Sequence, residues 1–246
     1  MRLNRYIASS GLCSRRKADE LIQSGKVRVN GVISEDFVDV NVGSDKIEYL
    51  TAPNVWAELK LDQELVVYAL NKPLDYVCSA LDAHNAKLVI DLVPKTARVF
   101  PVGRLDKDST GLLLLTNDGD LTNKLTSPAQ HIQKTYLVKC HIPPNYNRSQ
   151  LKLNLKKLST GIVLDGYPTL PAKIKLREEL NDDHILFEMT LFEGKNRQIR
   201  RMCQKIGLNV VELSRVSIGG LQLSDLKIDV GHYIKLNNNQ IKLLLK

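Results

Sequence analysis

Two short apolar runs flank a charged turn near the middle of the chain. The runs cover residues 99–102 and 112–115, and the turn between them, residues 103–108, reads Gly-Arg-Leu-Asp-Lys-Asp. Apolar runs of this length bounded by turn residues predict strands. The carboxylate of Asp106 then lies two residues from the guanidinium of Arg104, between apolar segments. We therefore expect the chemistry of this protein in this loop.

A helical pattern follows at residues 197–206. Its apolar stripe consists of Ile199, Met202, Cys203 and Ile206, and Gly207 supplies a stop. The spacing places Arg200 at the border of this stripe, whereas Arg197 and Arg201 point away from it. We expect Arg200 to enter a pocket and the other two arginines to contact phosphates. The alternative is a solvated basic face on a helix that packs on the core.

The first 31 residues predict a helix, a second helix and a hairpin. Ser14 is placed to cap the second helix and Gly25 to end it. Val27 and Val29 then begin a strand, and Asn30-Gly31 is a strong signal for a tight hairpin turn. These elements form a small α-α-β module.

The rest of the chain mixes short strands and helices. Residues 38–42 predict a strand, 51–54 a linker, and the domain boundary is expected between 50 and 64. Further strands are expected at 65–70, 134–138, 161–164, 172–176, 185–192, 210–218, 221–223 and 234–236, and helices at 88–92, 120–125 and 151–158. Residues 237–246 read as a tail. We expect an α+β protein with a module at 1–60 and a larger domain at 61–246.

The charge balance favours a polyanionic partner. The chain has 246 residues, is 43% hydrophobic and carries a net charge of +8. A basic excess favours nucleic acid before membrane here, because no basic amphipathic helix with a broad apolar face is evident. Ordinary solubilising charge is the alternative.

More than half of the net charge lies in the N-terminal module. Residues 1–31 hold two acids, Asp19 and Glu20, against seven basic residues. The basic residues, candidates for contact with a nucleic-acid backbone, are Arg2, Arg5, Arg15, Arg16, Lys17, Lys26 and Arg28. Three of them occupy the first turn of the second helix, where the helix dipole disfavours cations. A phosphate backbone would compensate, and a tolerated solvated face is the alternative.

Cysteine and histidine spacing argues against a metal site. Cys13, Cys78, Cys140 and Cys203 lie more than sixty residues apart, and the five histidines, among them His84, show no metal-binding spacing. The cysteines read as buried thiols in a reducing compartment. No apolar stretch approaches the roughly 20 residues of a membrane span. We expect a cytoplasmic protein with no membrane partner.

Residues 3–31, LNRYIASSGLCSRRKADELIQSGKVRVNG, closely resemble the S4 RNA-binding fold. This α-α-β module occurs in a ribosomal protein and in several RNA-modifying enzymes. The resemblance implies that the second helix and its basic face follow RNA phosphates, which agrees with the misplaced cations.

Three later motifs resemble the pseudouridine synthases that act on small- and large-subunit ribosomal RNA. They are GRLDKDSTGLLLLTNDG at 103–119, KTY at 134–136 and EGKNRQIRRM at 193–202. Their order and spacing match the family, and an N-terminal S4 module is its usual arrangement. The resemblance covers nearly the full chain and implies a catalytic domain built on a mainly antiparallel mixed sheet flanked by helices and loops.

The resemblance implies a role for each matched residue. Asp106 would attack the target nucleotide on the sugar or the base, and Tyr136 would stack on the extruded uracil and take part in deprotonation at C5. Arg200 would pair with Asp106, while Ile199 packs against the pocket. Arg104 would fill the gap left by the flipped base or steady the loop. No cofactor or metal is implied.

Two other functions compete with this interpretation. The first is a non-catalytic S4-type RNA-binding or ribosome-assembly factor, which would not need Asp106 or Tyr136. The second is a carboxylate-dependent nucleosidase, which would use two carboxylates around the scissile bond. Taken from the turn alone, both Asp106 and Asp108 read as turn formers, and we expect only Asp108 to remain one. The motif wording favours 23S over 16S ribosomal RNA, with tRNA possible, and we expect a monomer.

Overall fold

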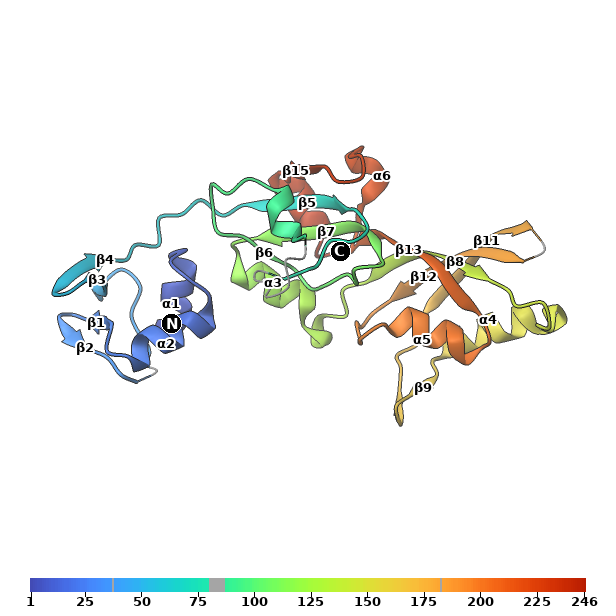
Figure 1. Ribbon diagram of the computed structural model, residues 1–246, viewed down its shortest axis with the longest axis horizontal. Helices are drawn as coiled ribbons and strands as arrows, with labels where there is room; N and C mark the ends of the chain where they lie inside the picture. The colour runs from blue at the N-terminus through green and yellow to red at the C-terminus, as the bar shows by residue number, and fades with distance from the viewer. Residues whose placement is uncertain (37, 80–86, 182) are drawn as a thin grey trace. The chain divides into compact units, whose positions relative to one another are not determined.

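The computed structural model describes residues 1–36, 38–79, 87–181 and 183–246 (Figure 1). The chain divides into two compact units. The first comprises residues 1–66, 95–98 and 117–119, and the second comprises 67–94, 99–116 and 120–246. His84 lies outside the described residues. Within the described part, every helix is too short or too polar to cross a membrane.

The first unit has the predicted α-α-β beginning. Helices α1 (Leu3–Ser9) and α2 (Arg15–Gln23) precede strands β1 (Val27–Val29), β2 (Val32–Ile33), β3 (Ile47–Ala52) and β4 (Val55–Glu58). The strands form a sheet in the order β2-β1-β3-β4. The Ser14 side chain caps α2 by accepting a bond of 3.2 Å from the Lys17 amide, as predicted. Asn30 and Gly31 both have positive φ in the β1–β2 turn, which confirms the hairpin.

Two predictions in this unit are wrong. Residues 38–42 form no strand; within them only Asp39 makes an isolated bridge, to Arg2. The alternation of Val38, Val40 and Val42 resembles a strand pattern, but only Val40 is buried. It packs into the core of the first unit from a loop. Residues 51–54 are not a linker but the end of β3 and the turn into β4, where Asn54 supplies a positive φ of 62°.

Arg28 is engaged within the module. Its Nε and Nη2 donate to the two carboxylate oxygens of Glu48 at 2.7 and 2.9 Å, and its guanidinium lies 4.6 Å from the Trp56 ring centroid. The hydrogen bonds from Arg28 are the main reason that the pKa of Glu48 falls to about 2. Arg28 is therefore engaged by residues of its own sheet, whereas the cations of α2 are exposed.

The described residues of the second unit form a nine-stranded sheet. Its main path is β11-β12-β8-β13-β7-β5-β15, with β6 beside β7 and β14 beside β13. The bounds are β5 Val67–Lys72, β6 Phe100–Pro101, β7 Thr110–Thr116, β8 Lys134–His141, β11 Lys173–Asn181, β12 His184–Leu191, β13 Asn209–Ile218, β14 Leu221–Gln222 and β15 Tyr233–Lys235. Only the β7–β13 pair is parallel. The predicted mainly antiparallel mixed sheet is confirmed.

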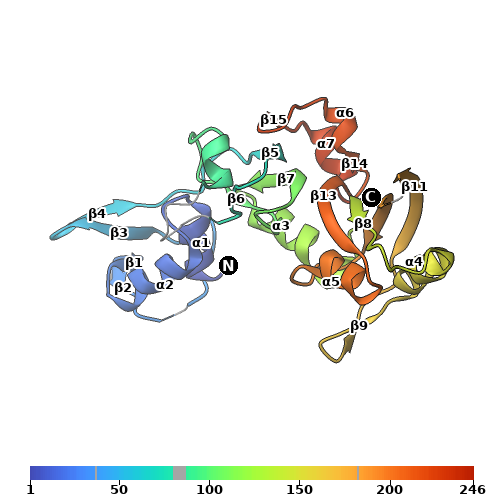
Figure 2. The ribbon, with the colours of Figure 1, turned by 45° about the vertical axis from the view of Figure 1, so that its right-hand side comes forward.

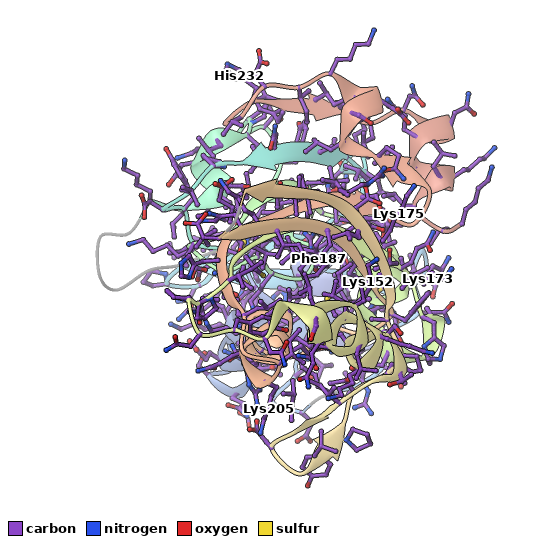
Figure 3. The ribbon with its side chains drawn as sticks, turned by 90° about the vertical axis from the view of Figure 1, so that its right-hand side faces the viewer. Lys152, Lys173, Lys175, Phe187, Lys205 and His232 are labelled. Carbon is purple, nitrogen blue, oxygen red and sulfur yellow. The ribbon has the colours of Figure 1, made fainter. Side chains whose placement is uncertain are left out.

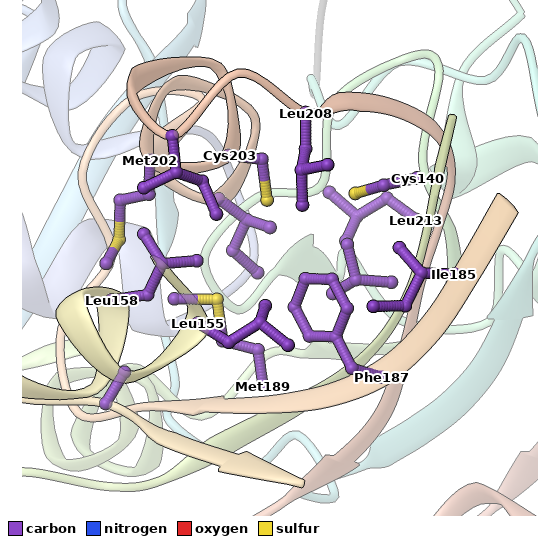
Figure 4. Close-up of a cluster of buried hydrophobic side chains, with 14 of the residues drawn as sticks. Cys140, Leu155, Leu158, Ile185, Phe187, Met189, Met202, Cys203, Leu208 and Leu213 are labelled. Carbon is purple, nitrogen blue, oxygen red and sulfur yellow. The ribbon is translucent and has the colours of Figure 1, made fainter. Parts of the chain in front are cut away.

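Helices α4 (Leu151–Thr160) and α5 (Gln198–Lys205) cover the β12–β8–β13 part of this sheet (Figure 2). Their apolar residues surround Phe187, which lies within the curve of the sheet, while Lys173 and Lys205 lie farther out (Figure 3). Cys140 and Cys203 belong to the same core and are free thiols (Figure 4). Strands β9 (Val163–Leu164) and β10 (Tyr167–Pro168) form a separate hairpin.

A second core lies around β5 and β7. Helices α3 (Gly119–Thr126), α6 (Leu223–Leu226) and α7 (Asn238–Leu243) contribute to it, and short 3-10 turns lie at Val89–Leu92, Pro128–Gln130 and Arg148–Gln150. The prediction of a tail at 237–246 is wrong. Asn237 and Gln240 form a reciprocal cap for α7, and Leu244 is fully buried. The cap, the packing of Ile241, Leu243 and Leu244 on the core, and a 2.8 Å bond from the Gly220 amide to the Leu243 carbonyl oxygen dock a segment whose apolar pattern is too short to stand out.

Candidate active site

The charged loop between β6 and β7 rests on a buried lysine. Lys72, at the end of β5, has no exposed surface, and its Nζ donates to the carbonyl oxygens of Ser109 at 2.8 Å and Pro73 at 3.0 Å. The Leu105 amide donates to the Cys78 sulfur at 3.4 Å. These contacts hold the loop on its buried side, and Asp106 remains partly exposed.

Beside this loop lies a pocket of about 300 Å³. It is enclosed by the 102–109 loop, the end of α3, the start of β8, the 191–199 segment and β13. Leu191, Ile199 and Leu213 give it apolar walls, and Asp106 and Tyr136 give it reactive groups. Its volume lies at the lower end of the range for ligand sites, which suits a small ligand group.

Arg197 is the cation that faces Asp106. It is the N-terminal cap residue of α5 and has a left-handed backbone with a φ of 46°. Its Nη1 lies 3.7 Å from Asp106 Oδ2, and its Nη2 donates to Asp108 Oδ2 at 3.0 Å. The prediction that Arg197 points away from the pocket assumed that this residue has helical backbone geometry. Because its backbone is left-handed, the side chain of Arg197 points towards the loop that holds Asp106 and Asp108.

Asp108 is more than a turn former, contrary to the prediction. Arg200 Nη2 donates to its carbonyl oxygen at 2.7 Å and lies 3.3 Å from its carboxylate. Burial alone would raise the pKa of Asp108, but the hydrogen bond from Arg197 and the charges of Arg200 and Arg197 outweigh burial and lower it. Arg200 thus contacts Asp108, whereas its expected partner Asp106 is faced by Arg197. Both arginines tie α5 to the loop.

The segment before α5 is held by its own polar contacts. Gln198 is 3% exposed; its Oε1 accepts from the Lys195 amide at 3.0 Å, and its Nε2 donates to Glu193 at 2.7 Å. Glu193 also accepts from the Leu170 amide at 2.9 Å. This network sets where α5 begins and therefore where Arg197 points.

Two strand cations in the pocket were assigned no role from the sequence. Lys134 precedes Tyr136 by two residues on β8, and Arg215 lies opposite Tyr136 on β13. No sequence signal singles out Arg215, because β13 carries several other polar residues, among them Ser214 and Ser217, and only the fold shows that Arg215 is 2% exposed. Pairing of β8 with β13, remote in sequence, brings both cations to Tyr136.

The other predicted residues are distributed as follows. Ile199 is buried in the pocket wall, and Arg104 lies exposed at the pocket. Arg201 forms an ion pair with Asp165 in the β9–β10 turn. In the first unit, Arg15, Arg16, Lys17 and Lys26 are exposed, and Lys17 pairs with Glu20. Arg2 is exposed and Arg5 half-buried.

The described residues contain no group of three His, Cys, Asp or Glu side chains that could hold a metal ion.

Comparison with protein families gives two matches. Residues 66–205 match the RNA pseudouridylate synthase family, and residues 1–36 match the S4 domain. The first match covers more than half of the chain and includes the pocket segments from the 102–109 loop to α5.

Individual relatives extend over the whole chain. The chain is 42% identical to ribosomal large subunit pseudouridine synthase B of Bacillus subtilis, over 95% of this chain and 94% of the relative. It is 36% identical to dual-specificity RNA pseudouridine synthase RluF of Escherichia coli, over 100% of this chain and 79% of the relative. A crystal structure of a pseudouridylate synthase superposes with a TM-score of 0.64 at 32% identity, covering 99% of both chains.

Proposed function

We propose that this chain, which belongs to the RNA pseudouridylate synthase family and begins with an S4 domain, isomerises uridine in large-subunit ribosomal RNA with Asp106 as the reacting carboxylate. The observation that carries the proposal is the shared pocket of Asp106, Tyr136 and Ile199. The choice of RNA is supported by the name of the Bacillus subtilis relative, a large-subunit enzyme that aligns over nearly its full length.

The reaction suits this pocket. The bond from C1′ to N1 of uracil breaks, the ring turns, and a new bond joins C1′ to C5, while C5 loses a proton and N1 gains one. Asp106 supplies a carboxylate for attack on the sugar or the base. Tyr136 supplies a flat surface for the extruded ring and a phenol oxygen for the proton at C5. A base in folded RNA must leave its stack to reach such a pocket.

The arginines divide into two roles in this proposal. Arg197 and Arg200 hold Asp108 and the loop, and Arg197 also faces Asp106. Arg104 is exposed at the pocket, where it is placed to meet the gap that the flipped base leaves. Arg201 pairs with Asp165 in the β9–β10 turn, where it is placed to meet the RNA backbone. Ile199 packs beside the base.

We further propose that residues 1–60 recruit RNA and residues 61–246 carry out catalysis, in a cytoplasmic monomer. The S4 match and the exposed cations of α2 support the first part. The free thiols of Cys140 and Cys203 are consistent with a reducing compartment.

Arg16 on α2 provides a test of recruitment. Arg16→Ala is expected to weaken RNA affinity by up to about fivefold and to lower the salt dependence of binding by about one unit of slope, because one phosphate contact is lost. Filter binding over a salt series measures both. Lys46→Ala is the control, since Lys46 lies outside α2, just before β3, and pairs with Glu48 at 3.1 Å. Equal losses in both variants would contradict a specific role for α2.

The target RNA is tested by mapping. Unmodified 23S rRNA, 16S rRNA and tRNA transcripts are incubated with the protein, and pseudouridines are located by carbodiimide labelling and primer extension. We expect new stops in 23S rRNA that are absent without protein. Stops confined to 16S rRNA or tRNA would overturn the choice of RNA. No conversion of any of the three RNAs would overturn the proposal as a whole.

A further inference from the structure

Arg215 is a buried cation with an unused donor. It is 2% exposed, and its Nε donates to the Leu112 carbonyl oxygen at 2.7 Å. Its Nη2 is buried and has no hydrogen-bond partner among the described residues. Its guanidinium forms no ion pair with a carboxylate of those residues. Burying a cation without a counterion costs free energy of folding, so we expect a bound ligand to accept a hydrogen bond from the free Nη2 of Arg215.

Lys134 is a second cation in the same pocket. Its Nζ donates to the Ile132 carbonyl oxygen at 2.9 Å, which leaves two of its three donors for other groups. Burial and, to a lesser extent, the positive charge of Arg215 lower the pKa of Lys134 to about 8. The two cations therefore lie close enough to repel each other in a partly buried site.

Both cations lie where the base is expected. The β8–β13 register places Arg215 directly opposite Tyr136, so their side chains project from the same face of the sheet. Lys134 precedes Tyr136 by two residues on β8 and shares that face as well. All three residues line the pocket that holds Asp106.

The isomerisation creates negative charge on the uracil ring, which these cations can stabilise. When the bond from C1′ to N1 breaks, its electron pair leaves with uracil, and the negative charge spreads to the ring carbonyl oxygens. After the ring turns, that electron density forms the bond from C5 to C1′, the proton leaves C5, and N1 takes up a proton, so the reaction balances. Donors fixed in advance around such a charge accelerate its formation.

We propose that Arg215 and Lys134 bind the carbonyl oxygens of the flipped uracil and stabilise the negative charge of the ring between bond breakage and bond formation. The inference rests on the proposed function, because it takes this pocket as the uridine site. A backbone phosphate is the less suitable occupant: Arg215 is almost wholly buried beside Tyr136 and Leu213, whereas phosphates stay near solvent.

The test separates rate from binding. Arg215→Met and Lys134→Met are compared with wild type in single-turnover reactions on the RNA that wild type modifies, and RNA affinity is measured separately. We expect each variant to lose on the order of 10² to 10³ in rate with little change in affinity. Lys139→Met is the matched control, because Lys139 lies on the opposite face of β8 and pairs with Glu212. Its rate should equal that of wild type.

A pH series provides a readout that a structural role would not change. The charged form of Lys134 predominates below its pKa, so the wild-type rate should fall as pH rises through about 8. Lys134→Arg keeps its charge and should lose this alkaline decline. The other titratable or charged groups along the pocket are Asp106, Tyr136, Glu193, Lys195, Arg104, Arg197 and Arg215, and they are unchanged in the variant.

The outcomes are distinct. Wild-type activity with full activity in both methionine variants would overturn this inference and leave the proposed function intact. If the methionine variants lose RNA affinity and their binding depends less on salt concentration, the cations contact a phosphate, and the inference is also overturned. An alkaline decline that persists in Lys134→Arg would exclude Lys134. An inactive wild type would overturn the proposed function and this inference together. If Arg215→Met does not fold, Lys134→Met and the pH series decide the question.

Discussion

Replacing Asp106 with asparagine is expected to lower the rate of pseudouridine formation by a factor on the order of 10⁴ or more. The substitution keeps the shape of the side chain and removes the charge that attack requires. The nearest cation, Arg197, lies 3.7 Å away and is also held by Asp108, so the loop should keep its place. RNA affinity should stay within about threefold, because the change removes negative charge from a site that receives a polyanion. Release of tritium from uracil C5 measures the rate.

Asp108→Asn is the matched control for this prediction. It removes a carboxylate from the same loop, but one that positions α5 through Arg197 and Arg200. Loss of a charge-assisted contact should cost a tenfold to hundredfold reduction in rate, on the order of 1.5–3 kcal/mol. Equal losses in the two variants would contradict a chemical role for Asp106 and reduce it to a member of the positioning network.

Replacing Gly111 with alanine is expected to produce the largest loss of stability. Gly111 has a φ of +98°, and a Cβ there would lie 2.3 Å from the carbonyl oxygen of Arg215 and 2.7 Å from its amide nitrogen. Backbone strain of about 1–3 kcal/mol and overpacking of about 1–3 kcal/mol together predict a loss of roughly 2–6 kcal/mol. Because the contact lies at the β7–β13 pair, the change also displaces the strand that carries Arg215.

Gly166→Ala separates the two contributions. Gly166 has a φ of +81°, but a Cβ there would meet no atom within 4 Å. This control therefore carries backbone strain without a clash and should lose only about 1 kcal/mol. Thermal unfolding followed by calorimetry compares the variants. If Gly111→Ala were no less stable than Gly166→Ala, the close approach of β7 and β13 would not be a constraint on this position.

Several elements could be predicted from the sequence because their signals are local. Ser14 and Gly25 bound α2, Asn30-Gly31 turns a hairpin, and Gly207 ends α5, since each feature acts within a few residues. The alternation of β12 also survives in the structure, with every second residue buried. Asp106 could be singled out from its charged loop and Tyr136 from the family resemblance of its motif, although no local rule shows that they share a pocket.

Predictions failed where burial depends on distant partners. Val38, Val40 and Val42 alternate like a strand, yet only Val40 packs into a core, and residues 237–246 became a docked helix through Leu244. The pairing of Asp108 with Arg197 and Arg200 joins groups about ninety residues apart, as their hydrogen bonds record. The left-handed cap at Arg197 decides which arginine faces Asp106.

The sequence by itself determined the α-α-β start, the charged loop between two strands and the basic helix near it, because caps, turns and periodicity act over short distances. Tertiary structure decided how these parts form a site. The register of β8 against β13 sets Lys134, Tyr136 and Arg215 on one face, and the close β7–β13 pair at Gly111 holds that face beside the Asp106 loop. Such pairings are fixed by the packing of remote strands, so the pocket and its two unassigned cations emerge only when the chain is folded.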